Sequence, residues 1–174
     1  MIVVNATVLS NLASAGKLEI LKELFGVVLV PVPVYEEVFR GIEIGYEFLE
    51  CIEEALKGGD WLKLTSFGEG SREIFRVLLD VVGYGEAAGI AISKERGLTF
   101  FSDDKVARKI ARENGVKVSG TIGILKVAVE EGKLSIDEAN VVLDRMIRGG
   151  YRSPVRAIEE VLQCNLRERP WRYR

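Results

Sequence analysis

The chain has 174 residues, of which 48% are hydrophobic and 29% charged, and its formal net charge is −2. This composition suits one globular domain with a sizeable core and excludes an intrinsically disordered chain. The longest apolar stretch, residues 25–35, is too short to span a bilayer and carries two prolines. No export signal precedes it, and the two cysteines lack metal-ligand spacing. We therefore expect a cytoplasmic protein with no membrane partner.

The chain contains no histidine. This excludes Ser-His-Asp triads, Cys-His nucleophile pairs and zinc sites of the HExxH kind. A P-loop motif is also absent, and residues 68–71 (GEGS) hold only a fragment of a dinucleotide-binding motif. Any catalysis must then depend on carboxylates, Lys, Arg and hydroxyl groups. The lack of histidine, with abundant Val, Ile, Glu, Lys and Arg, is typical of a thermophilic protein.

Short apolar runs alternate with helical patterns along the chain. The runs that predict buried strands are residues 2–4, 27–30, 98–101 and 116–118, with 61–64 as a weaker fifth. Helical spacing predicts helices over residues 8–15, 18–24, 34–39, 48–56, 74–82, 87–93, 106–114, 122–130, 136–147 and 155–166. This alternation favours an α/β fold, a three-layer α/β/α sandwich with a mainly parallel central sheet.

No linker or repeat divides the chain. We expect one domain over residues 1–150, with residues 151–174 forming a C-terminal helix and basic tail that packs on the domain or extends from it. The tail interleaves arginines with aromatic residues over 167–174, a pattern that suits gripping phosphates and stacking on bases. A frayed terminus or a dimer contact would explain the same pattern.

Polar residues directly follow the predicted strands, at the edge of the sheet where α/β proteins bind ligands. Asn5 follows the first strand, and Asp103 follows the run over 98–101. The helix after the second strand carries Glu36 and Glu37. Glu37 lies at i+3 from Val34 and so borders the buried side, whereas Glu36 points away from it. Glu37 is therefore the better candidate for a shared cleft.

Several of these polar residues also have a purely structural interpretation. Ser102 or Asp103 could cap the following helix, and Asp104 could pair with Arg108 at i,i+4. Glu86 lies in a first helical turn, where the helix dipole favours it by about 0.3–1 kcal/mol in any protein. If the acids do share one cleft, their mutual repulsion calls for a cation. Mg²⁺ or Mn²⁺ suits such oxygen ligands, and the chemistry that follows is phosphodiester hydrolysis.

Five segments together resemble the PIN domain family, and most closely its branch of VapC-like toxin ribonucleases. They are VVNATVL at 3–9, VPVPVYEEV at 30–38, GEAAGIA at 85–91, FSDDKVAR at 101–108 and GTIGIL at 120–125. No single segment is specific, but their order matches that of the family across roughly residues 1–150. The resemblance implies a Mg²⁺- or Mn²⁺-dependent RNA endonuclease, often dimeric and often held in check by an antitoxin protein.

The resemblance also implies which residues carry the chemistry. The catalytic and metal-ligand positions of the family fall on Asn5, Glu37, Glu86 and Asp103. Contacts to RNA are expected from Thr7, Lys105, Arg108 and Thr121; for the two cations, a solvated helix face is an equally good explanation.

Asn5 departs from the family, which has an acid at this position. A carboxamide keeps one oxygen but loses a charge, and one unit-charge pair is worth about 4 kcal/mol at ~4 Å and an effective dielectric of 20. Three explanations stay open: a catalytically degenerate PIN module that binds RNA or a protein without cleavage, a nuclease in which three acids suffice, or a deliberate Asp→Asn change. Further departures at Ala6 and Val8 favour drift over design.

Overall fold

The computed structural model describes residues 1–162, which form an α/β sandwich around a parallel sheet of five strands. The strands are β1 (Ile2–Val4), β2 (Val28–Pro31), β3 (Leu62–Thr65), β4 (Thr99–Phe101) and β5 (Val118–Ser119). They lie in the order β3-β2-β1-β4-β5, and every neighbouring pair is parallel. The five predicted strands and the predicted fold class are confirmed.

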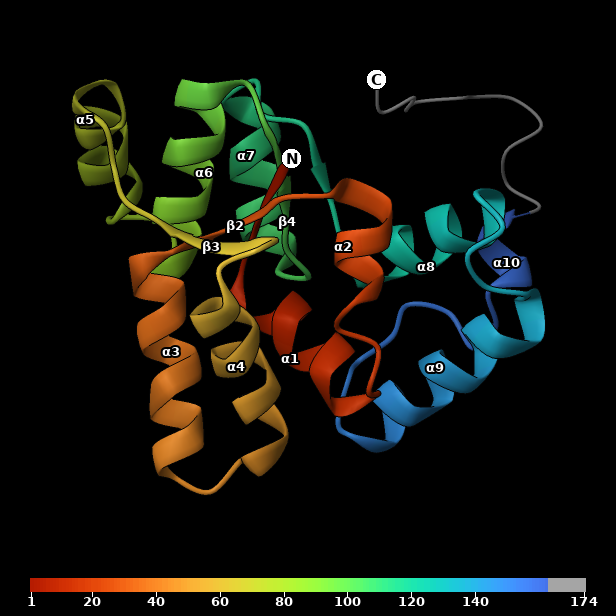
Figure 1. Cartoon of the computed structure of the whole chain (residues 1–174). Helices are drawn as coiled ribbons and strands as arrows, with labels where there is room; N and C mark the ends of the chain where they lie inside the picture. Colours follow the sequence, from red (N-terminus) through yellow and green to blue (C-terminus); the bar gives the residue numbers. More distant parts are fainter. Residues whose placement is uncertain (163–174) are drawn as a thin grey trace.

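Helices cover both faces of the sheet (Figure 1). Their bounds are α1 (Ala6–Ser14), α2 (Ile20–Phe25), α3 (Val32–Glu43), the 3-10 turn η1 (Glu47–Leu49), α4 (Glu50–Gly58), α5 (Glu69–Leu78), α6 (Tyr84–Arg96), α7 (Lys105–Glu113), α8 (Thr121–Glu130), α9 (Ile136–Arg148) and α10 (Glu159–Leu162). Successive strand residues point to opposite faces. Ile2 and Val4 therefore pack with α1 to α4, α8 and α9, whereas Val3 packs with α5, α6 and α7.

Two predicted helices differ from the observed ones. The helix predicted over 74–82 runs from Glu69 to Leu78, and its N-cap is Gly68, so the GEGS segment is a helix start. The last helix begins at Glu159, and before it the Ser153 hydroxyl bonds both the N–H and the C=O of Val155 in a local turn. The rest of that predicted helix and the basic tail lie outside the described residues. Within residues 1–162, no helix is both long and apolar enough to cross a membrane.

Helix α6 approaches the sheet closely through its small residues. A Cβ atom built on Gly89 would lie 2.2 Å from Cε2 of Phe100, a fully buried residue of β4. This position therefore has no room for a side chain unless the buried Phe100 ring moves. The close approach matters because α6 also carries Glu86.

We predict that Gly89→Ala destabilises the fold by about 1–3 kcal/mol through overpacking, which exceeds the helix-propensity gain of about 1 kcal/mol. The measurement is thermal unfolding, in which 1 kcal/mol corresponds to about 2–4 °C for a chain of this size. Gly58→Ala is the matched control, because a Cβ there meets nothing within 4 Å. Equal melting temperatures for the two variants would contradict the packing argument.

Candidate functional site

Asn5 caps the N-terminus of α1. Its side chain is 1% exposed, and Oδ1 accepts hydrogen bonds from the Val8 N–H at 3.2 Å and the Thr7 hydroxyl at 2.8 Å. An N-cap of this kind is worth about 1 kcal/mol. Oδ1, the only side-chain atom of Asn5 that could bind a metal, thus already accepts two hydrogen bonds from the first turn of α1.

The amide nitrogen of Asn5 faces the other way. Nδ2 donates to the Ser102 hydroxyl at 2.9 Å and lies 3.4 Å from Oε1 of Glu86. Flipping the amide would set its NH₂ group against the Val8 N–H, so that two donors would face each other without an acceptor. The helix cap therefore decides that a hydrogen-bond donor, rather than an oxygen ligand, faces Glu86.

Glu37 and Glu86 form an acidic pair across α3 and α6. A Cβ atom on Gly85 would lie 2.7 Å from Oε1 of Glu37, so the glycine permits this approach. Burial, and then the negative charge of Glu86, raise the pKa of Glu37. Arg40 and the backbone N–H of Gly85 lower the same pKa to a smaller degree. The two carboxylates thus share one electrostatic environment.

Asp103 is bound by neutral donors on both oxygens. Oδ1 accepts from the Thr121 N–H at 2.8 Å and lies 3.4 Å from the Tyr151 hydroxyl. Oδ2 accepts from the Thr121 hydroxyl at 2.5 Å and from Nδ2 of Asn11 at 2.9 Å. Hydrogen bonds to a charged group are worth about 1.5–3 kcal/mol each. Asp103 therefore joins β4 to α1, α8 and the segment after α9.

The residues around Asp103 correct two structural predictions. The cap of α7 is Asp104, whose Oδ1 accepts from the Ala107 N–H at 2.6 Å, and neither Ser102 nor Asp103 fills that role. Arg108 donates to the backbone oxygen of Ser102 at 3.3 Å and makes no ion pair with Asp104. The Ser102 hydroxyl instead links Asn5 to the start of α7, since it also accepts from the Asp104 N–H.

The predicted site residues thus meet in two groups. Asn5, Glu86 and Glu37 lie together, whereas Asp103 is held by Thr121. Within residues 1–162, no three or more His, Cys, Asp or Glu side chains are grouped so as to hold a metal ion. Of the residues expected to contact RNA, Thr7 is exposed beside Asn5, Thr121 is fully buried, and Lys105 and Arg108 line a cavity with Asp103.

Three residues that the sequence analysis did not select belong to the site. Ser102 could have been chosen as a polar residue at a strand end. Asn11 interrupts the apolar pattern of α1, a weak signal for a buried polar contact. Tyr151 gave no signal, because its contact with Asp103 joins residues 48 positions apart.

Comparison with protein-family models gives a match over residues 1–166 to a family described as PIN domain (DUF3368). The chain belongs to the PIN domain family. A search of curated proteins and a search of solved structures found no match. PIN domains are in general nuclease folds that bind RNA and depend on a divalent metal. The match extends beyond residue 150, and residues 151–162 pack on the same PIN domain, with Asn140 of α9 bonding Ile158 and Glu159.

The donor set of this PIN domain fits a small metal site. Glu37 and Glu86 supply two carboxylates, and Mg²⁺ is usually bound by one or two carboxylates with waters and substrate phosphates completing the shell. Asn5 presents a nitrogen that cannot coordinate, and both oxygens of Asp103 already accept hydrogen bonds. Glu37 and Glu86 are therefore the acids that fit an ion most directly, and the set of four positions stays a prediction.

We predict that Glu37 makes a contribution to the stability of this PIN domain that is lost as pH rises above 4.5, the ordinary pKa of Glu37. A raised pKa means that the folded state holds the proton more tightly than the unfolded state, so ionisation opposes folding. Glu37→Gln should remove this loss of stability, because a Gln side chain does not ionise. It can still accept the hydrogen bond from the Gly85 N–H. The measurement is the melting temperature of both proteins from pH 4 to pH 8. Glu36→Gln removes the neighbouring exposed carboxylate of α3 and should leave the pH profile unchanged; identical profiles in all three proteins would refute the prediction.

Proposed function

We propose that this PIN domain is a Mg²⁺- or Mn²⁺-dependent endoribonuclease of the VapC toxin type, which hydrolyses RNA phosphodiester bonds. The observation that carries the proposal is the acidic pair, Glu37 and Glu86, at the edge of the sheet where parallel strands end. The proposal includes a cytoplasmic homodimer and an antitoxin protein as its partner.

The residues have distinct roles in this proposal. Glu37 and Glu86 would hold the ion, which supplies an activated water and neutralises charge on the phosphate when bound. Asn5 positions Glu86 through its amide nitrogen. Asp103 positions the start of α8 through Thr121 and does not need to coordinate.

A second function is favoured by a specific observation. Because Asn5 turns a donor toward Glu86 and residues 1–162 contain no three-acid group, the chain suits a PIN module that binds RNA or a protein without cleaving. The two functions differ in whether two carboxylates retain enough affinity for the ion.

Cleavage of a structured RNA in Mn²⁺ separates these functions. We expect the natural chain to cut slowly, and Glu86→Gln to cut more than about tenfold more slowly because one of two ligands is lost. Asn5→Asp should lower the Mn²⁺ concentration for half-maximal cleavage by at least about tenfold, since 1.4 kcal/mol is enough for that change. Glu36→Gln is the matched control. If Asn5→Asp alone cuts, the natural chain is the binding module, and if no variant cuts, the nuclease proposal fails.

The melting temperature reports binding of the ion independently of cleavage. In EDTA, Asn5→Asp should melt below the natural chain, because a carboxylate replaces the donor beside Glu86 and adds like-charge repulsion. Added Mn²⁺ should raise the melting temperature of Asn5→Asp more than that of the natural chain. Equal shifts with Mn²⁺ in both proteins would show that position 5 does not touch the ion.

A further inference from the structure

A separate cavity of about 350 Å³ lies beside Asp103, and neither Glu37 nor Glu86 lines it. Its charged lining residues are Lys105 and Arg108 from α7, Arg152 from the segment after α9, and Asp103 itself. Three cations therefore share this space with one carboxylate.

The carboxylate does not neutralise these cations through direct pairs. Asp103 accepts hydrogen bonds only from neutral groups, and within residues 1–162 it forms no ion pair with Lys or Arg. Arg108 bonds a backbone oxygen, which carries no charge. Over the same residues, Lys105 and Arg152 form neither a salt bridge nor a side-chain hydrogen bond. With three cations and one carboxylate in its lining, the cavity carries an excess of positive charge.

The start of α8 adds backbone donors to the cavity wall. Ile122 and Gly123 lie in the first turn of this helix, where N–H groups have no partner within the helix. A Cβ atom on Gly120 would lie 2.6 Å from Oδ1 of Asp103 and 2.7 Å from Nη1 of Arg108. The absence of that side chain lets the guanidinium reach the helix start. Arg and helix N–H groups are the donors that phosphate recognition commonly uses.

We propose that this cavity binds a backbone phosphate of the RNA strand, separate from the phosphate that reaches Glu37 and Glu86. The inference rests on RNA being the substrate, as proposed above. Asp103 serves the cavity by holding α8 in place, and its bond to Asn11 of α1 connects the cavity to the acidic pair, since Asn5 caps α1 and contacts Glu86. In this proposal the cavity binds the RNA strand, and the Glu37–Glu86 pair is the separate site where a phosphodiester bond is cut.

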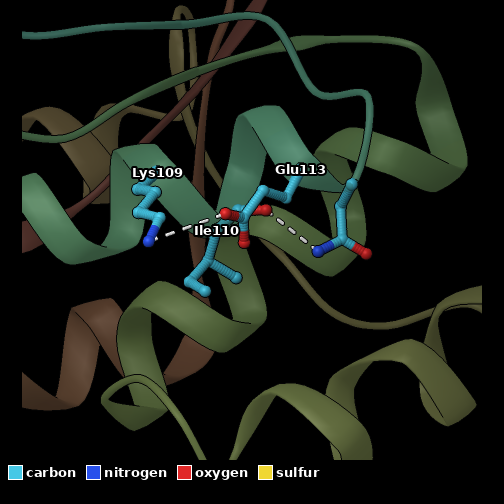
Figure 2. Close-up of polar contacts among 4 residues, drawn as sticks. Lys109, Ile110 and Glu113 are labelled. Atoms are coloured by element: carbon cyan, nitrogen blue, oxygen red, sulfur yellow. Dashed lines mark hydrogen bonds and ion pairs between the residues drawn. The ribbon is translucent and has the colours of Figure 1, made fainter.

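The test measures binding of a fluorescent single-stranded RNA by anisotropy, in EDTA so that nothing is cleaved. The variants are Lys105→Gln, Arg152→Gln and the double variant, each checked for an unchanged melting temperature. Arg108 is kept, because it also holds the backbone at Ser102. Lys109→Gln is the matched control: it removes the same charge from α7, but Lys109 lies outside the cavity and reaches Glu113 at 3.8 Å (Figure 2).

Each cavity variant should weaken RNA binding at least threefold and reduce the slope of log K against log salt by about 0.7, the value of one phosphate contact on a single strand. Lys109→Gln should stay within twofold of the natural chain, and Arg152→Lys should recover most of the affinity. If Lys109→Gln loses as much RNA affinity as the cavity variants, the effect depends only on the net charge of the protein and the proposal is wrong. Unchanged binding in the double variant, or an absence of RNA binding by the natural chain, would also overturn it.

These outcomes stay distinct from those of the nuclease proposal. Cavity-dependent RNA binding without Mn²⁺-dependent cleavage would keep the phosphate site and discard the nuclease. Cleavage that is insensitive to Lys105 and Arg152 would keep the nuclease and discard the phosphate site.

Discussion

The hydrogen bond from the Val8 N–H to Asn5 Oδ1 is the constraint on which the acidic site depends. It starts α1, and it also fixes which end of the amide reaches the cleft. An aspartate could cap the helix with one oxygen and offer the other to a cation. An asparagine that caps with its oxygen can offer only an NH₂ group. The asparagine therefore presents a hydrogen-bond donor to Glu86 where an aspartate would present a second oxygen.

A second constraint is the set of bonds on Asp103. Its carboxylate collects donors from α1, α8 and Tyr151, so the charge is stabilised without a cation. Burial and the charge of Asp103 raise the pKa of the Tyr151 hydroxyl, which keeps that group protonated as a donor. Asp103 thus has hydrogen-bond donors on both oxygens, whereas Glu37 and Glu86 repel each other.

The sequence supported the fold further than it supported the site. Apolar runs predicted all five strands because a parallel sheet buries both faces. The strand ends indicated Asn5 and Glu37 as candidate site residues, and the structure places both near Glu86. Amide orientation was not predictable, since it depends on the α1 backbone around Val8. Asp104 replaced its neighbours as the α7 cap because only backbone geometry distinguishes consecutive polar residues. The Asn11–Asp103 contact joins residues 92 positions apart, beyond any local pattern.

The division of charge explains how the two parts of the site can work together. The paired acids favour a cation, whereas Lys105, Arg108 and Arg152 favour an anion. Asp103 lines the cavity with these three cations, and both of its oxygens already accept hydrogen bonds from neutral groups. If Asp103 were free, it would pair with the nearby cations and close the cavity to phosphate. Neutral donors on Asp103 therefore keep the basic residues available. In the proposed function, Asp103 therefore serves less to bind metal than to keep the acidic pair and the basic residues from pairing with each other.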